Sequence, residues 1–200
     1  GLDGVEEGST SIADIDGDDA VDLTSENLLL SAGFGIGASD NPLEIQASTL
    51  SARSGTDDGP SNGTYILASN SLATGFVSVS VMRLGFDAAT PGSTTDVNQE
   101  DLESANAGPI VLVVESGDLV LMDANTDGDS VSAEGTANIL LRAVAGALTV
   151  HGNVVSGGGS ISILSTGNIT FLSTADLTTS GGGTLDIEST EGTVSFTTES

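Results

Sequence analysis

The stretch from residue 159 to residue 171, Gly-Ser-Ile-Ser-Ile-Leu-Ser-Thr-Gly-Asn-Ile-Thr-Phe, contains the pattern that decides the fold. Gly159 and Gly167 are each followed by apolar residues at the second and fourth positions, with polar residues between them. An alternation with a period of two is typical of a short strand that buries one face. The stretch therefore predicts two short strands, each entered through a glycine turn.

The same pattern recurs along most of the chain, and the spacing between its copies identifies a repeat. The first strands of successive pairs begin at Ile139, Ile161 and Leu185, and the second strands begin at Leu148, Ile169 and Val194. Residues 153–155 and 176–178 are expected to add a third strand to their coils. Because these intervals suit one coil of a parallel β-helix, we predict an all-β fold, a parallel β-helix (β-solenoid) with coils of about 21–25 residues and loop insertions.

An immunoglobulin-like sandwich also has many short strands, but it gives no reason for a repeat of about 22 residues. Gly, Ser, Thr and β-branched residues fill almost every window, which disfavours helices. We interpret residues 1–200 as one continuous β-solenoid segment, less regular at 1–107 and regular at 108–200, and as a processed chain or an excerpt of a longer one. In the first part we expect strands at 27–31, 43–47, 49–52, 64–68 and 76–82, and a loop excursion at 87–108. This excursion is expected to contribute to any binding surface, and a disordered acidic loop is the alternative.

The charge balance excludes several classes of partner. The chain has 29 acidic residues, three Arg and no Lys, for a formal net charge of −26. We expect no nucleic acid and no anionic membrane surface as partners, because both require clustered basic residues. Such acidity makes the compact state repel itself and requires screening salt or bound cations. With no Cys and one His, any bound metal must prefer oxygen ligands. No apolar run approaches the ~18 residues of a membrane helix, so no membrane insertion is expected.

Two acidic segments have the spacing of calcium loops. The first runs from residue 123 to residue 134 and matches the pattern D-x-[DN]-x-[DN]-G-x5-E in full. Its predicted ligands are Asp123, Asn125, Asp127, Asp129 and Glu134. The flanking helices of an EF-hand are missing, and the interval containing this segment is longer than the others, so we expect a loop inserted between coils. A solvated Asp-Gly turn is the alternative.

The second acidic segment, residues 14–23, is similar to the calcium loops of integrin-type propeller repeats. That resemblance implies Asp14, Asp16, Asp18 and Asp22 as calcium ligands, with a backbone carbonyl from Ala20. Asp19 stands where the propeller pattern has Gly, and a solvated turn is again the alternative.

Residues 33–37, Gly-Phe-Gly-Ile-Gly, residues 40–45, Asp-Asn-Pro-Leu-Glu-Ile, and the Gly-Asn-Ile-Thr-Phe run at 167–171 are typical of one protein family. With these motifs the chain resembles the large repetitive bacterial exoproteins and adhesins of the filamentous-haemagglutinin type. The resemblance implies a right-handed parallel β-helix, export to the cell surface or medium, and an adhesive or matrix role. It implies no catalytic residue.

We therefore expect an extracellular or cell-surface structural or adhesive segment, stabilised by calcium, and not an enzyme. Its expected partners are copies of itself or neighbouring segments of a longer chain, by end-to-end stacking, and surface polysaccharide or other cells. One alternative is a self-assembling filament or surface-layer subunit. The other is a glycosidase-like enzyme acting on polysaccharide, which needs paired carboxylates and, in most cases, aromatic residues that are scarce here.

Overall fold

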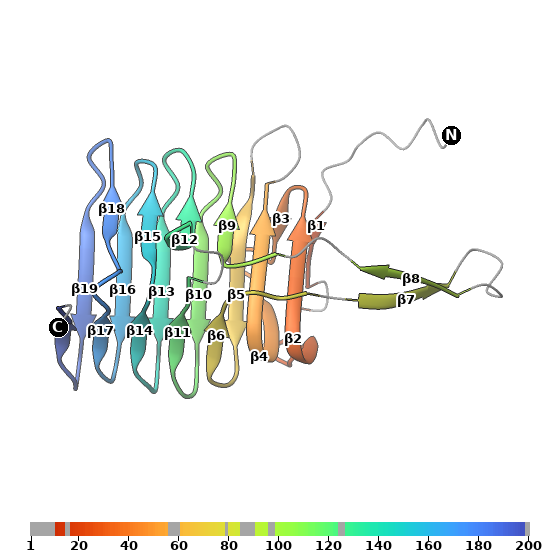
Figure 1. The fold of residues 1–200 in the computed structure, drawn as a ribbon, viewed down its shortest axis with the longest axis horizontal. Coiled ribbons are helices and arrows are strands. Elements are labelled where there is room, and N and C mark those ends of the chain that lie inside the picture. The colour runs from red at the N-terminus through yellow and green to blue at the C-terminus, as the bar shows by residue number, and fades with distance from the viewer. Residues whose placement is uncertain are drawn as a thin grey trace.

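The computed structural model describes residues 11–14, 17–55, 61–78, 80–84, 91–95, 99–123 and 127–198. None of these residues is helical, and their strands form one sheet of eighteen strands and a separate antiparallel pair. All strand pairings within the large sheet are parallel, and the coils are stacked along one axis from the N-terminal to the C-terminal side (Figure 1). The predicted all-β parallel β-solenoid is confirmed.

Each regular coil contributes one strand to each of three columns. The first column contains β5 (Gly63–Ala68), β10 (Ile110–Val114), β13 (Ile139–Ala143), β16 (Ile161–Ser165) and β19 (Leu185–Ser189). The second contains β6 (Leu72–Thr74), β11 (Leu119–Leu121), β14 (Leu148–Val150), β17 (Ile169–Phe171) and β20 (Val194–Phe196). The third contains β9 (Leu102–Ser104), β12 (Asp129–Ala133), β15 (Asn153–Ser156) and β18 (Leu177–Thr179).

The register of the columns follows the spacing in the sequence. Ile139 lies opposite Ile161, which lies opposite Leu185, so the predicted first strands of the pairs are direct neighbours. In the second column, Ile169 lies between Leu148 and Val194, as their spacing predicts. The pairing of β15 with β18 confirms the predicted third strands.

The core is a narrow stack of aliphatic side chains. Alternate residues of each strand point inward and are buried, as the alternating burial of β10, β13 and β16 shows. The central coils bury Ile110, Leu112, Leu119, Leu121, Val131, Ile139, Leu141, Leu148, Val150, Val154, Ile161, Ile163, Ile169 and Phe171. Burial of apolar surface is the main force that stabilises such a stack.

Polar residues at the turns connect each coil to the next. Asn138 and Asn168 precede strands of the first and second columns, and their Oδ1 atoms accept hydrogen bonds from the backbone N–H groups of Ser160 (2.8 Å) and Thr193 (3.0 Å). The turn glycines allow neighbouring backbones to approach closely: a Cβ on Gly159 would lie 2.0 Å from the carbonyl oxygen of Ala137. In the Gly-Asn-Ile-Thr-Phe run, Gly167 also allows a close approach, since a Cβ there would lie 2.7 Å from the carbonyl oxygen of Gly146, and Asn168 adds the side-chain link to the next coil.

The N-terminal coils contain β1 (Ser11–Ile12), β2 (Leu23–Ala32), β3 (Gly35–Ile36) and β4 (Leu43–Ser54). The strands expected at 43–47 and 49–52 are one strand, β4, because no glycine or proline interrupts residues 43–54. β4 turns through all three columns, since its successive parts pair with β5, β6 and β9.

The excursion differs from its predicted position. We expected a strand at 76–82 and a loop at 87–108, but the strand of the second column is β6, and β9 already belongs to the third. Between them an antiparallel hairpin of β7 (Ser80–Leu84) and β8 (Pro91–Thr95) extends away from the solenoid (Figure 1). Paired backbone hydrogen bonds between Val77 and Gln99 close its base. The prediction was wrong because alternation after Gly75 does not distinguish a coil strand from a hairpin strand.

Candidate functional site

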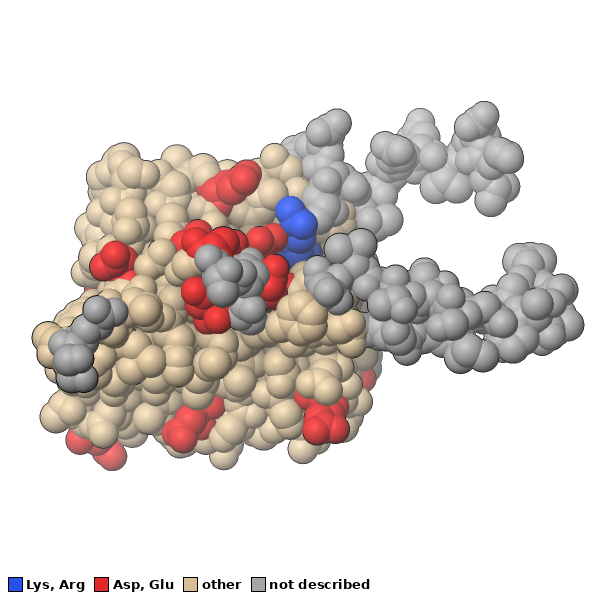
Figure 2. All heavy atoms as spheres, in the orientation of Figure 1, with Lys and Arg blue, Asp and Glu red and all other residues tan. Residues whose placement is uncertain are grey.

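The largest gathering of carboxylates in Figure 2 lies on the face formed by β9 and β12. Asp101 and Glu103 on one coil and Asp127 and Asp129 on the next line a cavity of about 160 Å³, which we call the acidic hollow. Asp101 is buried and has a φ of 62°. At the rim, the guanidinium of Arg53 forms an ion pair with Glu103 at 2.9 Å. The hollow thus carries an excess of negative charge.

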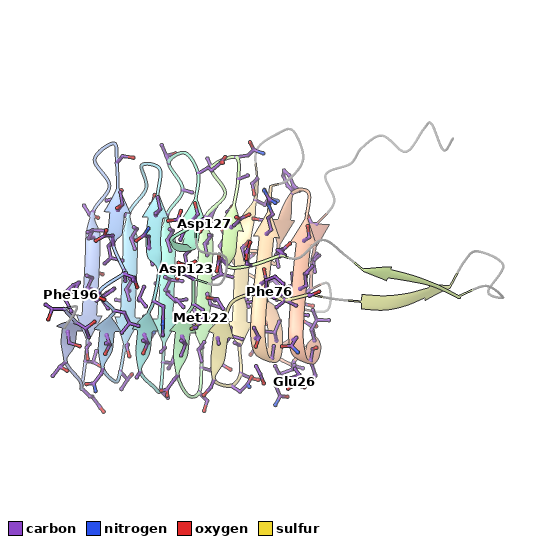
Figure 3. All side chains as sticks on the ribbon, in the orientation of Figure 1. Glu26, Phe76, Met122, Asp123, Asp127 and Phe196 are labelled. Atoms are coloured by element: carbon purple, nitrogen blue, oxygen red, sulfur yellow. The ribbon has the colours of Figure 1, made fainter. Side chains whose placement is uncertain are left out.

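Only part of the predicted first calcium loop lies at the acidic hollow. Figure 3 shows Asp123 and Asp127 on this face of the solenoid. Asp127 accepts a hydrogen bond from the backbone N–H of Asp129 (2.9 Å), and Asp129 accepts one from the side-chain amide of Asn153 (3.0 Å). Asn125 lies outside the described residues.

The predicted insertion between coils is present at this loop. Val131 lies opposite Leu102 on one neighbouring coil and opposite Val154 on the other. The stretch of chain from Leu102 to Val131 is longer than the stretch from Val131 to Val154, although each completes one coil. The additional residues belong to the part of the chain between the end of β11 at Leu121 and the start of β12 at Asp129.

Glu134 does not lie with Asp129. Asp129 begins β12 and Glu134 directly follows it, so an extended strand separates the two residues by roughly 15 Å at about 3.3 Å per residue. Glu134 instead borders an adjoining cavity of about 110 Å³ with Arg53 and Glu103. In an EF-hand the chain curls around the ion before the last ligand. Here Val131 and Ala133 are buried in the core within the extended strand β12, so this part of the chain does not curl back toward Asp129.

The second acidic segment brings together two of its four predicted ligands. Asp14, which follows β1, and Asp22, which directly precedes β2, meet Glu44 of β4, and one carboxylate oxygen from each lies within 4.8 Å of the others. Asp18 turns away: its Oδ1 accepts a hydrogen bond from the backbone N–H of Ala20 (2.8 Å). Asp16 lies outside the described residues.

Glu44 is an outward-facing residue that is nevertheless buried. Leu43 and Ile45 point into the core, so alternation along β4 directs Glu44 to the opposite side of the sheet. Its side chain is nonetheless buried, with the residue only 4 % exposed. Burial raises the pKa of the Glu44 carboxyl, and a hydrogen bond with Asp22 and the charges of Asp22 and Asp14 raise it further. Its Oε2 is buried and has no hydrogen-bond partner.

Sequence reasoning missed Glu44, although a signal was present. A lone Glu between two apolar residues of a strand is typical of a solvent-facing side chain. However, Asp22 precedes Glu44 by the length of one coil, so the repeat alone places the two carboxylates next to each other. The strand prediction and the loop prediction had to be combined to find the pair.

The C-terminal end of the described solenoid presents core positions to solvent. Leu185, Val194 and Phe196 are 48, 41 and 63 % exposed, whereas Ile169 and Phe171 one coil earlier are fully buried. The ring of Phe196 stacks on that of Phe171 with centroids 4.6 Å apart. Figure 3 shows Phe196 at this end of the stack. We call Leu185, Val194 and Phe196 the terminal face.

No protein-family model matches the chain, and neither a curated protein nor a solved structure resembles it significantly. The fold therefore defines the class of protein by itself, and that class is the parallel β-solenoid. Among the described residues there is no helix long and apolar enough to cross a membrane.

Proposed function

We propose that this chain is a structural or adhesive segment of a secreted or cell-surface bacterial protein, related in kind to the filamentous-haemagglutinin type, and that it is not an enzyme. The terminal face is the observation that carries the proposal. Exposed apolar side chains that continue a buried ladder leave a favourable surface for another coil.

The partner at the terminal face is a further coil, either from a neighbouring segment of a longer chain or from another copy of the chain. The last strands, β19 and β20, offer backbone N–H and C=O groups on their outer edge as well as the side chains of Leu185, Val194 and Phe196. Such edges readily pair with another strand. End-to-end stacking therefore supports a fibrous or matrix role, and a self-assembling filament or surface-layer subunit is the version in which identical copies stack.

The acidity of the chain favours an extracellular location rich in salt and calcium. A net charge of −26 on 200 residues is a strong source of self-repulsion, which divalent cations relieve. Calcium is therefore proposed as the stabilising ion, and surface polysaccharide or other cells are the proposed targets of adhesion. The acidic hollow favours one other function, because paired carboxylates are the machinery of glycosidases.

The test compares the wild-type chain with Phe196→Asp and with Phe76→Asp. Phe76 is 48 % exposed and lies on the flank, so it controls for the loss of an exposed phenylalanine. Light scattering and negative-stain microscopy should show concentration-dependent end-to-end association of the wild type and of Phe76→Asp. Phe196→Asp should remain monomeric with an unchanged circular dichroism spectrum.

Two results would overturn the proposal. The first is a Phe196→Asp chain that associates as the wild type does; a wild type that stays monomeric at every concentration would reject the stacking of identical copies. The second is the release of reducing ends from a panel of polysaccharides, which would assign the chain to the glycosidases.

A further inference from the structure

We infer that Asp14, Asp22 and Glu44 form a binding site for a hard divalent cation, best suited to calcium, that fastens the two ends of the connection between β1 and β2 to the next coil. The inference deepens the calcium part of the proposed function and rests on it. It does not depend on the adhesive role. The site differs from the predicted propeller-type loop because one ligand comes from a different coil and Asp18 is not a ligand.

The three carboxylates have the spacing of a single coordination shell. Their ligand oxygens all lie within 4.8 Å of one another. Oxygen ligands lie 2.3–2.6 Å from calcium, so oxygens on opposite sides of the ion are about 5 Å apart. One ion can therefore contact all three side chains.

Glu44 provides the independent sign of a missing ligand. An ionised carboxylate that is buried with an unpartnered oxygen costs free energy unless a positive charge or a donor compensates it. The Oε2 of Glu44 is in this position, 4 % exposed at the residue level, with two further carboxylates beside it. A cation between the three groups removes both the repulsion and the unsatisfied oxygen.

Hydrogen bonds hold both ends of the connection between β1 and β2 in place for such an ion. At one end, the side-chain amide of Asn41 donates a hydrogen bond to the carbonyl oxygen of Asp14 (3.0 Å). At the other end, the N–H of Asp22 donates to the carbonyl oxygen of Glu44 (3.0 Å), and the N–H of Glu44 donates to Oδ2 of Asp22 (3.2 Å). The site is therefore preorganised by bonds that do not require the ion.

The donor set favours calcium over other metals. Carboxylates are hard ligands, and the cluster contains neither the imidazole nor the thiolate that zinc and copper prefer. Magnesium usually keeps several waters and takes only one or two protein carboxylates, whereas calcium accepts more carboxylates in flexible geometry. Three carboxylates from two coils suit the larger ion.

The test titrates calcium chloride into the full, chelator-treated chain by calorimetry and records the thermal midpoint, with sodium chloride of equal ionic strength as reference. The key variant is Glu44→Gln, which keeps the shape of the side chain and removes its charge. The matched control is Asp18→Asn, which removes one charge from the same loop outside the cluster.

We expect saturating calcium to raise the wild-type midpoint by about 5 °C or more. Glu44→Gln should bind one calcium fewer, or bind it at least tenfold more weakly, and should melt above the wild type when no divalent cation is present. Asp18→Asn should respond to calcium as the wild type does, and magnesium chloride should bind the wild type more weakly.

The outcomes separate the two claims. If calcium stabilises the wild type and Glu44→Gln equally, the cross-coil site is wrong while calcium stabilisation stands. If Asp18→Asn no longer responds to calcium, the ligands are instead those of the propeller-type loop predicted at residues 14–23. If calcium has no effect beyond that of sodium chloride on any chain, the calcium part of the proposed function fails as well. Tighter binding of magnesium would overturn the assignment to calcium.

Discussion

Asp22 and Glu44 lie directly opposite each other on adjacent parallel coils, joined by a backbone hydrogen bond of 3.0 Å and by a bond of 3.2 Å from the N–H of Glu44 to the carboxylate of Asp22. Like charges opposite each other in a sheet are destabilising by up to ~1 kcal/mol, and burial of one of them increases the cost. We therefore expect this pair to make the stability of the N-terminal coils depend on divalent cations.

Replacing Asp22 with Asn should therefore act in opposite directions with and without calcium. In chelator the variant should melt about 2–4 °C above the wild type, since one of two facing charges is gone. In calcium it should melt below the wild type, since a ligand is gone. Asp186→Asn is the control, because Asp186 lies opposite the neutral Ser162 and should change neither midpoint. Equal shifts in both conditions would contradict the role of the pair.

Gly159→Ala should destabilise the solenoid far more than Gly158→Ala. A Cβ on Gly159 would meet the carbonyl oxygen of Ala137 at 2.0 Å, whereas a Cβ on Gly158 would meet its nearest atoms at 3.5 Å. We expect a loss of about 2–3 kcal/mol for the first change and less than about 0.5 kcal/mol for the second. Urea unfolding followed by circular dichroism measures both, and similar losses would contradict the close stacking of the turns.

Phe171→Ala and Phe196→Ala should differ although the two rings stack on each other. Phe171 is fully buried, so its truncation should cost about 3–5 kcal/mol through lost burial and a cavity. Phe196 is largely exposed, so its truncation should cost about 1 kcal/mol at most in the monomer. Unfolding is to be measured at a concentration where light scattering shows a monomer. Equal costs would mean that the core does not end at Phe171.

Tyr65 should limit stability at alkaline pH. Burial raises the pKa of its phenol above the ordinary 10.0, so the folded state favours the neutral form. The stabilising effect is complete below the pKa of the unfolded chain and is lost as pH rises through the raised pKa of the folded state. Tyr65 is the single tyrosine in a chain without tryptophan, so phenolate absorbance reports its titration directly. The variant Tyr65→Phe should lose this part of the alkaline destabilisation. A titration at or below the ordinary value would contradict the burial.

The sequence was sufficient to predict the regular coils, because each position in a solenoid column repeats at a nearly constant interval. In the structure Ile139 pairs with Ile161, and Ile161 pairs with Leu185, as their spacing in the sequence predicts. The excursion was harder to place, because β7 overlaps the strand expected at 76–82 and β8 lies in the stretch predicted as a loop, and the two pair with each other and not with the coils. Local alternation carries no information about the partner strand.

The candidate sites were only partly predictable, because the local sequence does not show which parts of the chain lie next to each other. Motif spacing assumes that the chain curls around an ion, but residues 129–133 form a strand that carries Glu134 away from Asp129. Conversely, Glu44 belongs to no motif and reaches Asp14 and Asp22 only through the stacking of coils. Ligands that come from neighbouring coils can be recognised in a sequence only when the pairing of the coils is already known.

The in-register stacking of coils is tested most directly by disulfide formation between introduced cysteines, since the chain has no cysteine of its own. Thr149, Thr170 and Ser195 lie opposite one another on three successive coils. Neighbouring strands are about 4.8 Å apart, within the range that a disulfide bridges, whereas positions two coils apart are about 10 Å apart and beyond that range. Mild oxidation should consume both thiols in the 149/170 and 170/195 double variants and leave them free in the 149/195 variant. Free thiols in the first two pairs, or a rapid bond in the third, would contradict the stacked coils on which every proposal here depends.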